Sequence, residues 1–200
     1  EPLQPGFVIE RYELLRQLGH GGMGTVFQAK QLEPVERLVA LKVLRSGFLT
    51  AGAAARVEAE RQTLAVLKHP GIVSVLDAGR LHDGRPWFVM DYVAGDSLTT
   101  FCREQHLPLA DRLRLMIDLC DAVRHAHFRG IIHQDLKPSN VLVERVDGRP
   151  VCRLIDFGIR RDLGSGSEGS GPRGGTPDYM SPEQSSGNSA GADTRSDVFA

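Results

Sequence analysis

Four polar side chains between positions 135 and 156 have the types and spacing for phosphate chemistry with a metal ion. Asn140 and Asp156 offer an amide oxygen and a carboxylate, hard ligands that Mg²⁺ combines with water and substrate phosphates. Asp135 lies on the segment leading to Asn140, close enough along the chain to accept a proton from a hydroxyl beside that metal. Lys137 adds a positive charge for a phosphate. Together these residues predict a magnesium and phosphate site with a proton acceptor beside it.

A predicted β-hairpin positions the two metal ligands. Residues 141–143 and 151–155 are apolar and are predicted to be strands, and Asp-Gly at 147–148 is a turn signal between them. If the turn is centred there, antiparallel pairing sets Asn140 opposite the residue before Asp156. We therefore expect the Asn140 amide and the Asp156 carboxylate at the same end of the hairpin.

A glycine-rich stretch follows a predicted strand near the N-terminus. Tyr12, Leu14 and Leu18 lie at strand-like spacing, and Gly-x-Gly-x-x-Gly then occupies positions 19–24. Glycines let backbone N–H groups approach phosphates closely. A plain glycine-rich hairpin tip is the alternative. Thr-Val-Phe at 25–27 predicts a second strand directly after the glycines, whereas a dinucleotide-binding fold needs a helix there.

The next predicted strand carries a lysine on a largely apolar face. In residues 39–44 a period of two places Ala40 and Lys42 on one face, where the small Ala40 leaves room for a flat ring. Either Lys42 extends to solvent from an edge strand, or it meets an anion. The helix predicted over 53–68 offers that anion, because Glu60 lies on its apolar stripe and a buried carboxylate needs a cation. We expect Lys42 to pair with Glu60.

Two further strands are predicted at residues 72–76 and 87–90, around a turn at Asp83-Gly84. They would complete a small antiparallel sheet. Residues 91–95 then break the apolar run. Sequence pattern alone leaves this segment as a loop between two elements.

An amphipathic helix is predicted over residues 109–129, where it would support the loop that carries Asp135. Its apolar stripe consists of Leu113, Ile117, Cys120 and Val123. His125 and His127 also lie on this helix, but residues two apart point to different faces and no acidic ligand is adjacent. A metal site there is not expected, and His133 is expected to be a packed structural histidine.

Composition and charge limit the classes of partner. The 200 residues are 41% hydrophobic and 24% charged, as in ordinary globular chains, and a net charge of -1 gives no general attraction for nucleic acid. Cys102, Cys120 and Cys152 are odd in number and far apart, which favours reduced thiols and a cytoplasmic location. No apolar run approaches the roughly 20 residues that span a bilayer. We expect no membrane segment within this chain.

The run from position 133 to 158, His-Gln-Asp-Leu-Lys-Pro-Ser-Asn followed by the hairpin and Asp-Phe-Gly, resembles the catalytic loop and metal-binding segment of eukaryotic-type serine/threonine protein kinases, in a bacterial-looking form. The resemblance implies an α+β, bilobal protein-kinase-like fold, with a small antiparallel-sheet lobe carrying one helix and a larger, mainly helical lobe. The lobes would be residues 11–90 and 96–200, joined by a hinge at 91–95. Since the family's larger lobe is longer and the chain starts at Glu1, we expect a fragment.

The resemblance also implies the ligands and the residues that hold them. ATP and Mg²⁺ would be the cofactors, with Asp135 accepting the substrate proton and Lys137 stabilising the transferred phosphoryl group. Asn140 and Asp156 would hold the metal. Backbone groups of Asp91 and Val93 would pair with adenine, and Met90 would be the gatekeeper residue of the pocket. The implied ATP-binding residues are Leu18, Gly19, Gly21, Gly22, Gly24, Val26, Ala40, Lys42, Glu60, Asp91, Val93 and Leu142.

The C-terminal third resembles the regulatory and substrate-docking segments of the same family. Residues 163–175 combine Ser165, Ser167 and Ser170 with glycines, like a mobile activation loop, although a flexible linker gives the same composition. Gly-Thr-Pro-x-Tyr-Met-Ser-Pro-Glu then resembles the docking segment for a protein substrate. Asp197 resembles the aspartate that supports the catalytic loop.

One residue departs from the family pattern. Gln134 stands where many members have the arginine that pairs with a phosphorylated activation loop, so control by loop phosphorylation is less expected. The expected partners are ATP, a protein substrate and a dimer partner for autophosphorylation, with any membrane anchor outside this chain. The alternatives are an ATP-binding pseudokinase and a small-molecule phosphotransferase.

Overall fold

The structure is a computed structural model and describes residues 3–22, 24–45, 67–157, 177–185 and 193–200. The chain divides into two compact units. The sheet unit contains described residues 3–45 and 74–92, and the helical unit contains 67–73, 93–157, 177–185 and 193–200. In the described residues, the chain passes between the units at Val73–Ser74 and again at Tyr92–Val93.

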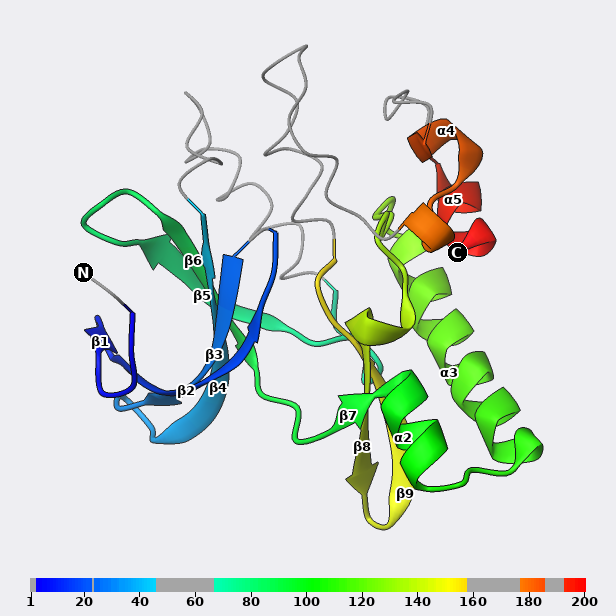
Figure 1. Cartoon of the computed structure of the whole chain (residues 1–200), viewed down its shortest axis with the longest axis horizontal. Coiled ribbons are helices and arrows are strands. Elements are labelled where there is room, and N and C mark those ends of the chain that lie inside the picture. Colours follow the sequence, from blue (N-terminus) through cyan, green and yellow to red (C-terminus); the bar gives the residue numbers. More distant parts are fainter. Residues whose placement is uncertain (1–2, 23, 46–66, 158–176, 186–192) are drawn as a thin grey trace. The chain divides into compact units, whose positions relative to one another are not determined.

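The sheet unit is a six-stranded antiparallel sheet with strand order β1-β2-β3-β4-β6-β5 (Figure 1). Its strands are β1 (Val8–Ile9), β2 (Tyr12–His20), β3 (Gly24–Gln31), β4 (Arg37–Leu44), β5 (Val75–Arg80) and β6 (Pro86–Asp91). A strand directly follows the glycine-rich stretch, as the β-branched and aromatic residues there predict.

Alternation along β4 separates the core of the sheet unit from the candidate site. Val39, Leu41 and Val43 are buried within a core cluster that also includes Trp87 and Val89 of β6. Their neighbours in β4 therefore point to the opposite face. Lys42 is one of these neighbours, so it lies on the face opposite the core, as the alternation predicted.

The strand predicted over 72–76 is wrong in its boundaries. β5 spans Val75–Arg80 and pairs with β6, whereas Ile72 forms a parallel bridge to Leu154 in the helical unit. Gly79 lies opposite Trp87, and a side chain at position 79 would overlap the indole ring. Packing against Trp87 thus favours a strand at residues 77–80, which have little intrinsic β propensity.

The helical unit combines a three-stranded sheet with four α-helices in its described part (Figure 1). The strands are β7 (Asp96–Ser97), β8 (Val141–Val146) and β9 (Arg149–Leu154). The helices are α2 (Leu98–Glu104), α3 (Leu109–His127), α4 (Pro182–Ser185) and α5 (Thr194–Phe199), with 3-10 turns at Pro138–Asn140 and Pro177–Tyr179.

The predicted hairpin of this unit is confirmed. Val141 pairs with Leu154, and the backbone N–H of Ile155 donates to the Asn140 carbonyl at 2.9 Å. Asp147 and Gly148 form the turn with φ values of 50° and 78°, the left-handed conformations that a tight hairpin turn requires.

Helix α3 is confirmed, but its predicted packing stripe is largely wrong. Leu113, Ile117 and Cys120 are exposed, and only Val123 of the predicted stripe is buried. The buried residues are Leu115, Leu119, Ala122, Val123 and Ala126. This second apolar stripe packs against β9, where the Cys152 thiol donates to the Leu115 carbonyl at 3.4 Å, and burial raises the pKa of Cys152 to about 12.

Several predicted features lie outside the described residues. They are residues 53–66 of the predicted helix, with Glu60, the serines at 165, 167 and 170, and the glycine that ends Asp-Phe-Gly. The last two residues of that predicted helix, 67 and 68, are described and are not helical. Within the described part of the chain, no helix has the length and apolar character needed to cross a membrane.

Candidate active site

A buried carboxylate fixes the start of the loop that carries Asp135. Asp197 of α5 is 4% exposed, and its two oxygens accept the backbone N–H groups of His133 and Gln134, each at 2.8 Å. The Asp197 Oδ2 atom also contacts the His127 Nε2 at 2.7 Å. The predicted supporting role of Asp197 is thereby confirmed, and His127 has a structural partner.

His133 is packed and neutral, as expected for a structural histidine. Its Nδ1 accepts the backbone N–H of Asp135 at 3.3 Å, so Nε2 carries the proton that is donated to the Ile155 carbonyl at 2.9 Å. Burial lowers the pKa of His133. The ring also lies 4.7 Å from the ring of Phe157. His133 therefore connects the Asp135 loop to the segment that follows β9.

Asp135, Lys137 and Asn140 meet within this loop. The Lys137 ammonium donates to Asp135 Oδ2 at 2.9 Å. The Asn140 amide nitrogen donates to the Asp135 carbonyl at 2.8 Å and to Asp135 Oδ2 at 3.1 Å. Because these bonds use the nitrogen of the amide, the Asn140 oxygen is directed away from Asp135 and can serve as a metal ligand.

The hairpin register brings Asp156 to the same end as Asn140. Asn140 immediately precedes β8, and the residue before Asp156 donates its N–H to the Asn140 carbonyl. Asp156 has a φ of 62°, a left-handed conformation that is uncommon for a residue with a side chain and is often found at functional sites. An amide oxygen and a carboxylate at one hairpin end fit the donor set of Mg²⁺.

The glycine-rich stretch forms the tip of the β2–β3 hairpin. Gly21 and Gly24 exchange backbone hydrogen bonds at 2.9 Å and 3.3 Å. A side chain at position 24 would overlap the Val43 carbonyl, whereas no atom of the described residues lies within 4 Å of a Cβ added to Gly19, Gly21 or Gly22. Gly24 is thus required by strand packing, and the other glycines border open space.

Lys42 lies on the face of β4 opposite the core. Its direct partners across the sheet are Val26 and Phe88, and Ala40 pairs with Met90, so these side chains share that face. Lys42 is 3% exposed, and β4 lies between β3 and β6. The alternative of a solvent-extended lysine on an edge strand is therefore wrong. Glu60, its predicted partner, is outside the described residues.

The remaining predicted nucleotide contacts are distributed over both units. Leu18 lies in a β-bulge of β2, and Asp91 ends β6 and donates its N–H to the Ser74 carbonyl at 3.1 Å. In the helical unit, Val93 is buried and Leu142 lies on β8. Because the Asp91 N–H is already used, the Asp91 carbonyl is the backbone group of this residue that could bond to the edge of a base.

Glu183 of the docking segment and the adjacent Gln184 contact other parts of the helical unit, and these contacts were not predicted from the sequence. Gln184 bonds to Ser181 and to the carbonyl of Gln134, and the Ser196 hydroxyl donates to Glu183. Accepting that bond lowers the pKa of Glu183. No spacing rule marks an amide or a hydroxyl for such contacts.

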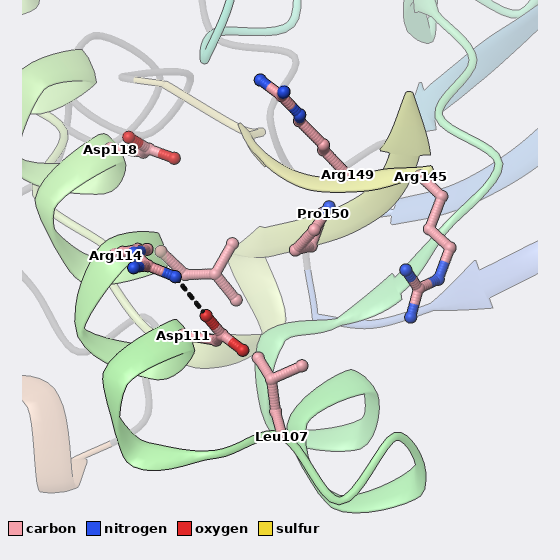
Figure 2. Close-up of a pocket in the computed structure, with 8 residues that line it drawn as sticks. Leu107, Asp111, Arg114, Asp118, Arg145, Arg149 and Pro150 are labelled. Atoms are coloured by element: carbon pink, nitrogen blue, oxygen red, sulfur yellow. Dashed lines mark hydrogen bonds and ion pairs between the residues drawn. The ribbon is translucent and has the colours of Figure 1, made fainter. Parts of the chain in front are cut away.

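A pocket of about 550 Å³ opens between α3 and the β8–β9 hairpin (Figure 2). Leu107, Asp118, Arg145 and Pro150 are among its lining residues, and none of the predicted site residues is. Two further charged residues that line it, Asp111 and Arg114, are paired with each other at 2.6 Å. The pocket is therefore not the predicted phosphate and metal site.

Comparison with known proteins identifies what the chain is similar to. The family model described as "Protein kinase domain" matches residues 12–200. The serine/threonine-protein kinase pkn3 of Myxococcus xanthus is 39% identical over 198 residues, which cover 95% of this chain and 36% of pkn3. The DNA damage-responsive serine/threonine-protein kinase RqkA of Deinococcus radiodurans is 40% identical over 209 residues, covering 100% of this chain and 30% of RqkA.

The fold agrees with these matches. The crystal structure of the PknI kinase domain of Mycobacterium tuberculosis superposes with a TM-score of 0.73 at 32% sequence identity, covering 98% of this chain and 73% of that domain. The chain spans about a third of the length of pkn3 and RqkA. The predicted kinase-like fold is confirmed.

Proposed function

This chain belongs to the protein kinase domain family, and from that membership we propose that the protein transfers the γ-phosphoryl group of ATP to serine or threonine hydroxyls of other proteins. The observation that carries the proposal is the contact of Asp135 with both Lys137 and Asn140 in a loop held by a buried aspartate. Asp-Leu-Lys-Pro at 135–138 favours the serine/threonine class.

We assign Asp135 as the acceptor of the substrate hydroxyl proton. Its bonds from Lys137 and Asn140 hold the carboxylate in one orientation, so a hydroxyl can be aligned without reorganisation of the loop. Lys137 lies beside Asp135, where its ammonium can also approach the phosphoryl group as negative charge develops there. These residues contribute position and charge, which is most of what phosphoryl transfer requires of a protein.

Asn140 and Asp156 are the residues that would hold Mg²⁺, and Mg²⁺ when bound neutralises phosphate charge. In the sheet unit, the open space at Gly19, Gly21 and Gly22 suits a phosphate chain, and Val26, Ala40 and Leu18 suit an adenine ring. Lys42, with Glu60, would orient the phosphates. Backbone groups of Asp91 and Val93 would pair with the base, and Leu142 is a further expected nucleotide contact.

We further propose the division into a small lobe at 11–90, a hinge at 91–95 and a larger lobe from 96. The expected partners are a protein substrate and a second copy of the kinase during autophosphorylation. A cytoplasmic location of this domain fits its unpaired cysteine pattern, with Cys102 and Cys152 buried as free thiols.

The proposal is tested by phosphate transfer from labelled ATP to a generic protein substrate, using the full-length protein. Asp135→Asn should lower kcat by about 10²- to 10⁴-fold while ATP still raises the Tm. Lys42→Met should abolish both transfer and the ATP-dependent rise in Tm. Asp121→Asn, which changes an exposed carboxylate of α3 paired with Arg124, is the matched control and should behave like the wild type.

The same experiment separates the alternatives. An ATP-dependent rise in Tm without transfer in the wild type would identify a pseudokinase. Labelling of small molecules but of no protein would identify a small-molecule phosphotransferase. Transfer that survives Asp135→Asn undiminished would remove Asp135 from its assigned role.

A further inference from the structure

The side chain of Gln184 links the docking segment to the loop that carries Asp135. Its Oε1 accepts both the backbone N–H and the hydroxyl of Ser181, each at 3.1 Å. Its Nε2 donates to the backbone carbonyl of Gln134 at 2.8 Å. Both ends of the amide are thus engaged, which fixes its orientation.

The acceptor of this bond lies in an unusual backbone conformation. Gln134 has a φ of 64°, a left-handed conformation that costs free energy for a residue with a side chain. Its N–H is held by Asp197 and its carbonyl by Gln184. Since Asp135 is the next residue, the orientation of this peptide determines the direction in which Asp135 leaves the turn.

The other end of the link is also well anchored. Ser181 is 1% exposed, and the neighbouring Glu183 accepts the hydroxyl of Ser196, the residue before Asp197. The docking segment, α5 and the Asp135 loop therefore form a closed set of hydrogen bonds. Gln184 is the member of that set that connects the docking segment directly to the loop.

We propose that Gln184 is a positioning residue for phosphoryl transfer, which couples the placement of the substrate-docking segment to the orientation of Asp135. This inference rests on the proposed kinase function. It assigns to Gln184 no contact with substrate or nucleotide. Its effect is exerted through the Gln134 peptide.

Two substitutions of similar size break the link in different ways. Gln184→Glu keeps an oxygen for Ser181 but turns a second oxygen toward the Gln134 carbonyl, where two acceptors repel. Gln184→Met removes both polar ends. At pH 8 each should lower kcat for casein phosphorylation by about tenfold, the effect of one buried hydrogen bond, with the KM for ATP unchanged.

The pH profile distinguishes positioning from a general packing defect. A carboxyl group that faces a carbonyl has a raised pKa and, once protonated, can donate to that carbonyl as the amide does. The deficit of Gln184→Glu should therefore shrink between pH 8 and pH 5.5, while that of Gln184→Met stays constant. Gln105→Glu, which adds the same charge at an exposed amide bonded to Arg145, should match the wild type throughout.

Amide hydrogen exchange of peptides that cover residues 131–137 gives a readout without activity. Exchange should be faster in both Gln184 variants than in the wild type at pH 8, with little change in Tm. Variants with wild-type kcat and wild-type exchange would overturn the inference, as would equal, pH-independent deficits. Absence of phosphate transfer by the wild type would refute the kinase function. Amide hydrogen exchange of residues 131–137 would then still test whether Gln184 holds the Asp135 loop.

Discussion

Asp197 accepts the backbone N–H of His133 at 2.8 Å, although the two residues are 64 positions apart in the sequence. Its second oxygen accepts the N–H of Gln134, and its side chain is 1% exposed. Asp197 therefore helps to fix the conformation of the Asp135 loop, together with the contacts of His133 and Gln184.

Asp197→Asn should disturb this loop selectively. Asparagine has one acceptor oxygen, so one of the two backbone N–H donors would face an NH₂ group and lose its partner. We expect a loss of about 1–3 kcal/mol in the free energy of unfolding, together with a lower kcat. Urea denaturation and steady-state kinetics of the same preparation measure both quantities.

Asp193→Asn is the matched control for that change. Asp193 precedes α5, caps its first turn by accepting the N–H of Arg195 and is accessible to solvent. Asparagine caps helices about as well as aspartate. Equal losses in the two variants would contradict a specific role of Asp197.

The hairpin at Asn140 was predictable because its signals are local. Asp-Gly at 147–148 sets the turn, the turn sets the register, and the register sets Asn140 beside the residue before Asp156. The alternation that placed Lys42 opposite the core is equally local. Period and turn chemistry were sufficient for both.

The predictions for α3 and β5 were wrong because contacts with residues distant in the sequence decide the packed face of the helix and the bounds of the strand. Helix α3 has apolar residues on two sides, and contact with β9 selects the stripe through Leu115 and Leu119 instead of that through Leu113 and Ile117. Likewise, β5 is displaced along the chain by the contact of Gly79 with Trp87. Neither choice is encoded in the segment itself.

Gly24 and Gly22 should respond differently to the same substitution. A methyl group at position 24 would overlap the backbone carbonyl of Val43, so β3 and β4 would have to separate. We expect Gly24→Ala to lower the free energy of unfolding by about 1–3 kcal/mol, measured by urea denaturation.

In the part of the chain that the structure describes, no atom lies within 4 Å of a methyl group at position 22, so Gly22→Ala should leave the stability unchanged. It should raise the KM for ATP, because the methyl group would occupy space proposed for the phosphates. A wild-type KM would exclude Gly22 from the phosphate-binding loop.

Burial of His133 should make the protein less stable in mild acid. Burial lowers the pKa of His133 in the folded state, so below the ordinary value of about 6.5 the unfolded chain binds a proton that the folded chain does not. The contribution is fully present above that pH and is lost as the pH falls. The free energy of unfolding should decrease by up to about 1.4 kcal/mol per pH unit for this group.

His133→Phe isolates the contribution. The variant loses the donor to the Ile155 carbonyl and should be less stable than the wild type at pH 8. The difference should narrow toward pH 5.5, because phenylalanine binds no proton. His125, whose pKa burial also lowers, is present in both proteins and leaves a residual slope in each. A difference that is constant with pH would refute the assignment of a neutral His133.

Activity should not depend on phosphorylation of the serines at 165, 167 and 170. Gln134 has no charge, and its Nε2 is buried with no hydrogen-bond partner among the residues that the structure describes. A phosphate dianion needs a cation, and an arginine at this position would supply one. The triple alanine variant should therefore keep kcat within a few-fold of the wild type.

In a Gln134→Arg background, the same triple substitution should lower kcat more, because the introduced guanidinium could then pair with a phosphorylated serine. A large loss of kcat in the wild-type background, with an unchanged Tm, would show that another cation receives the phosphate.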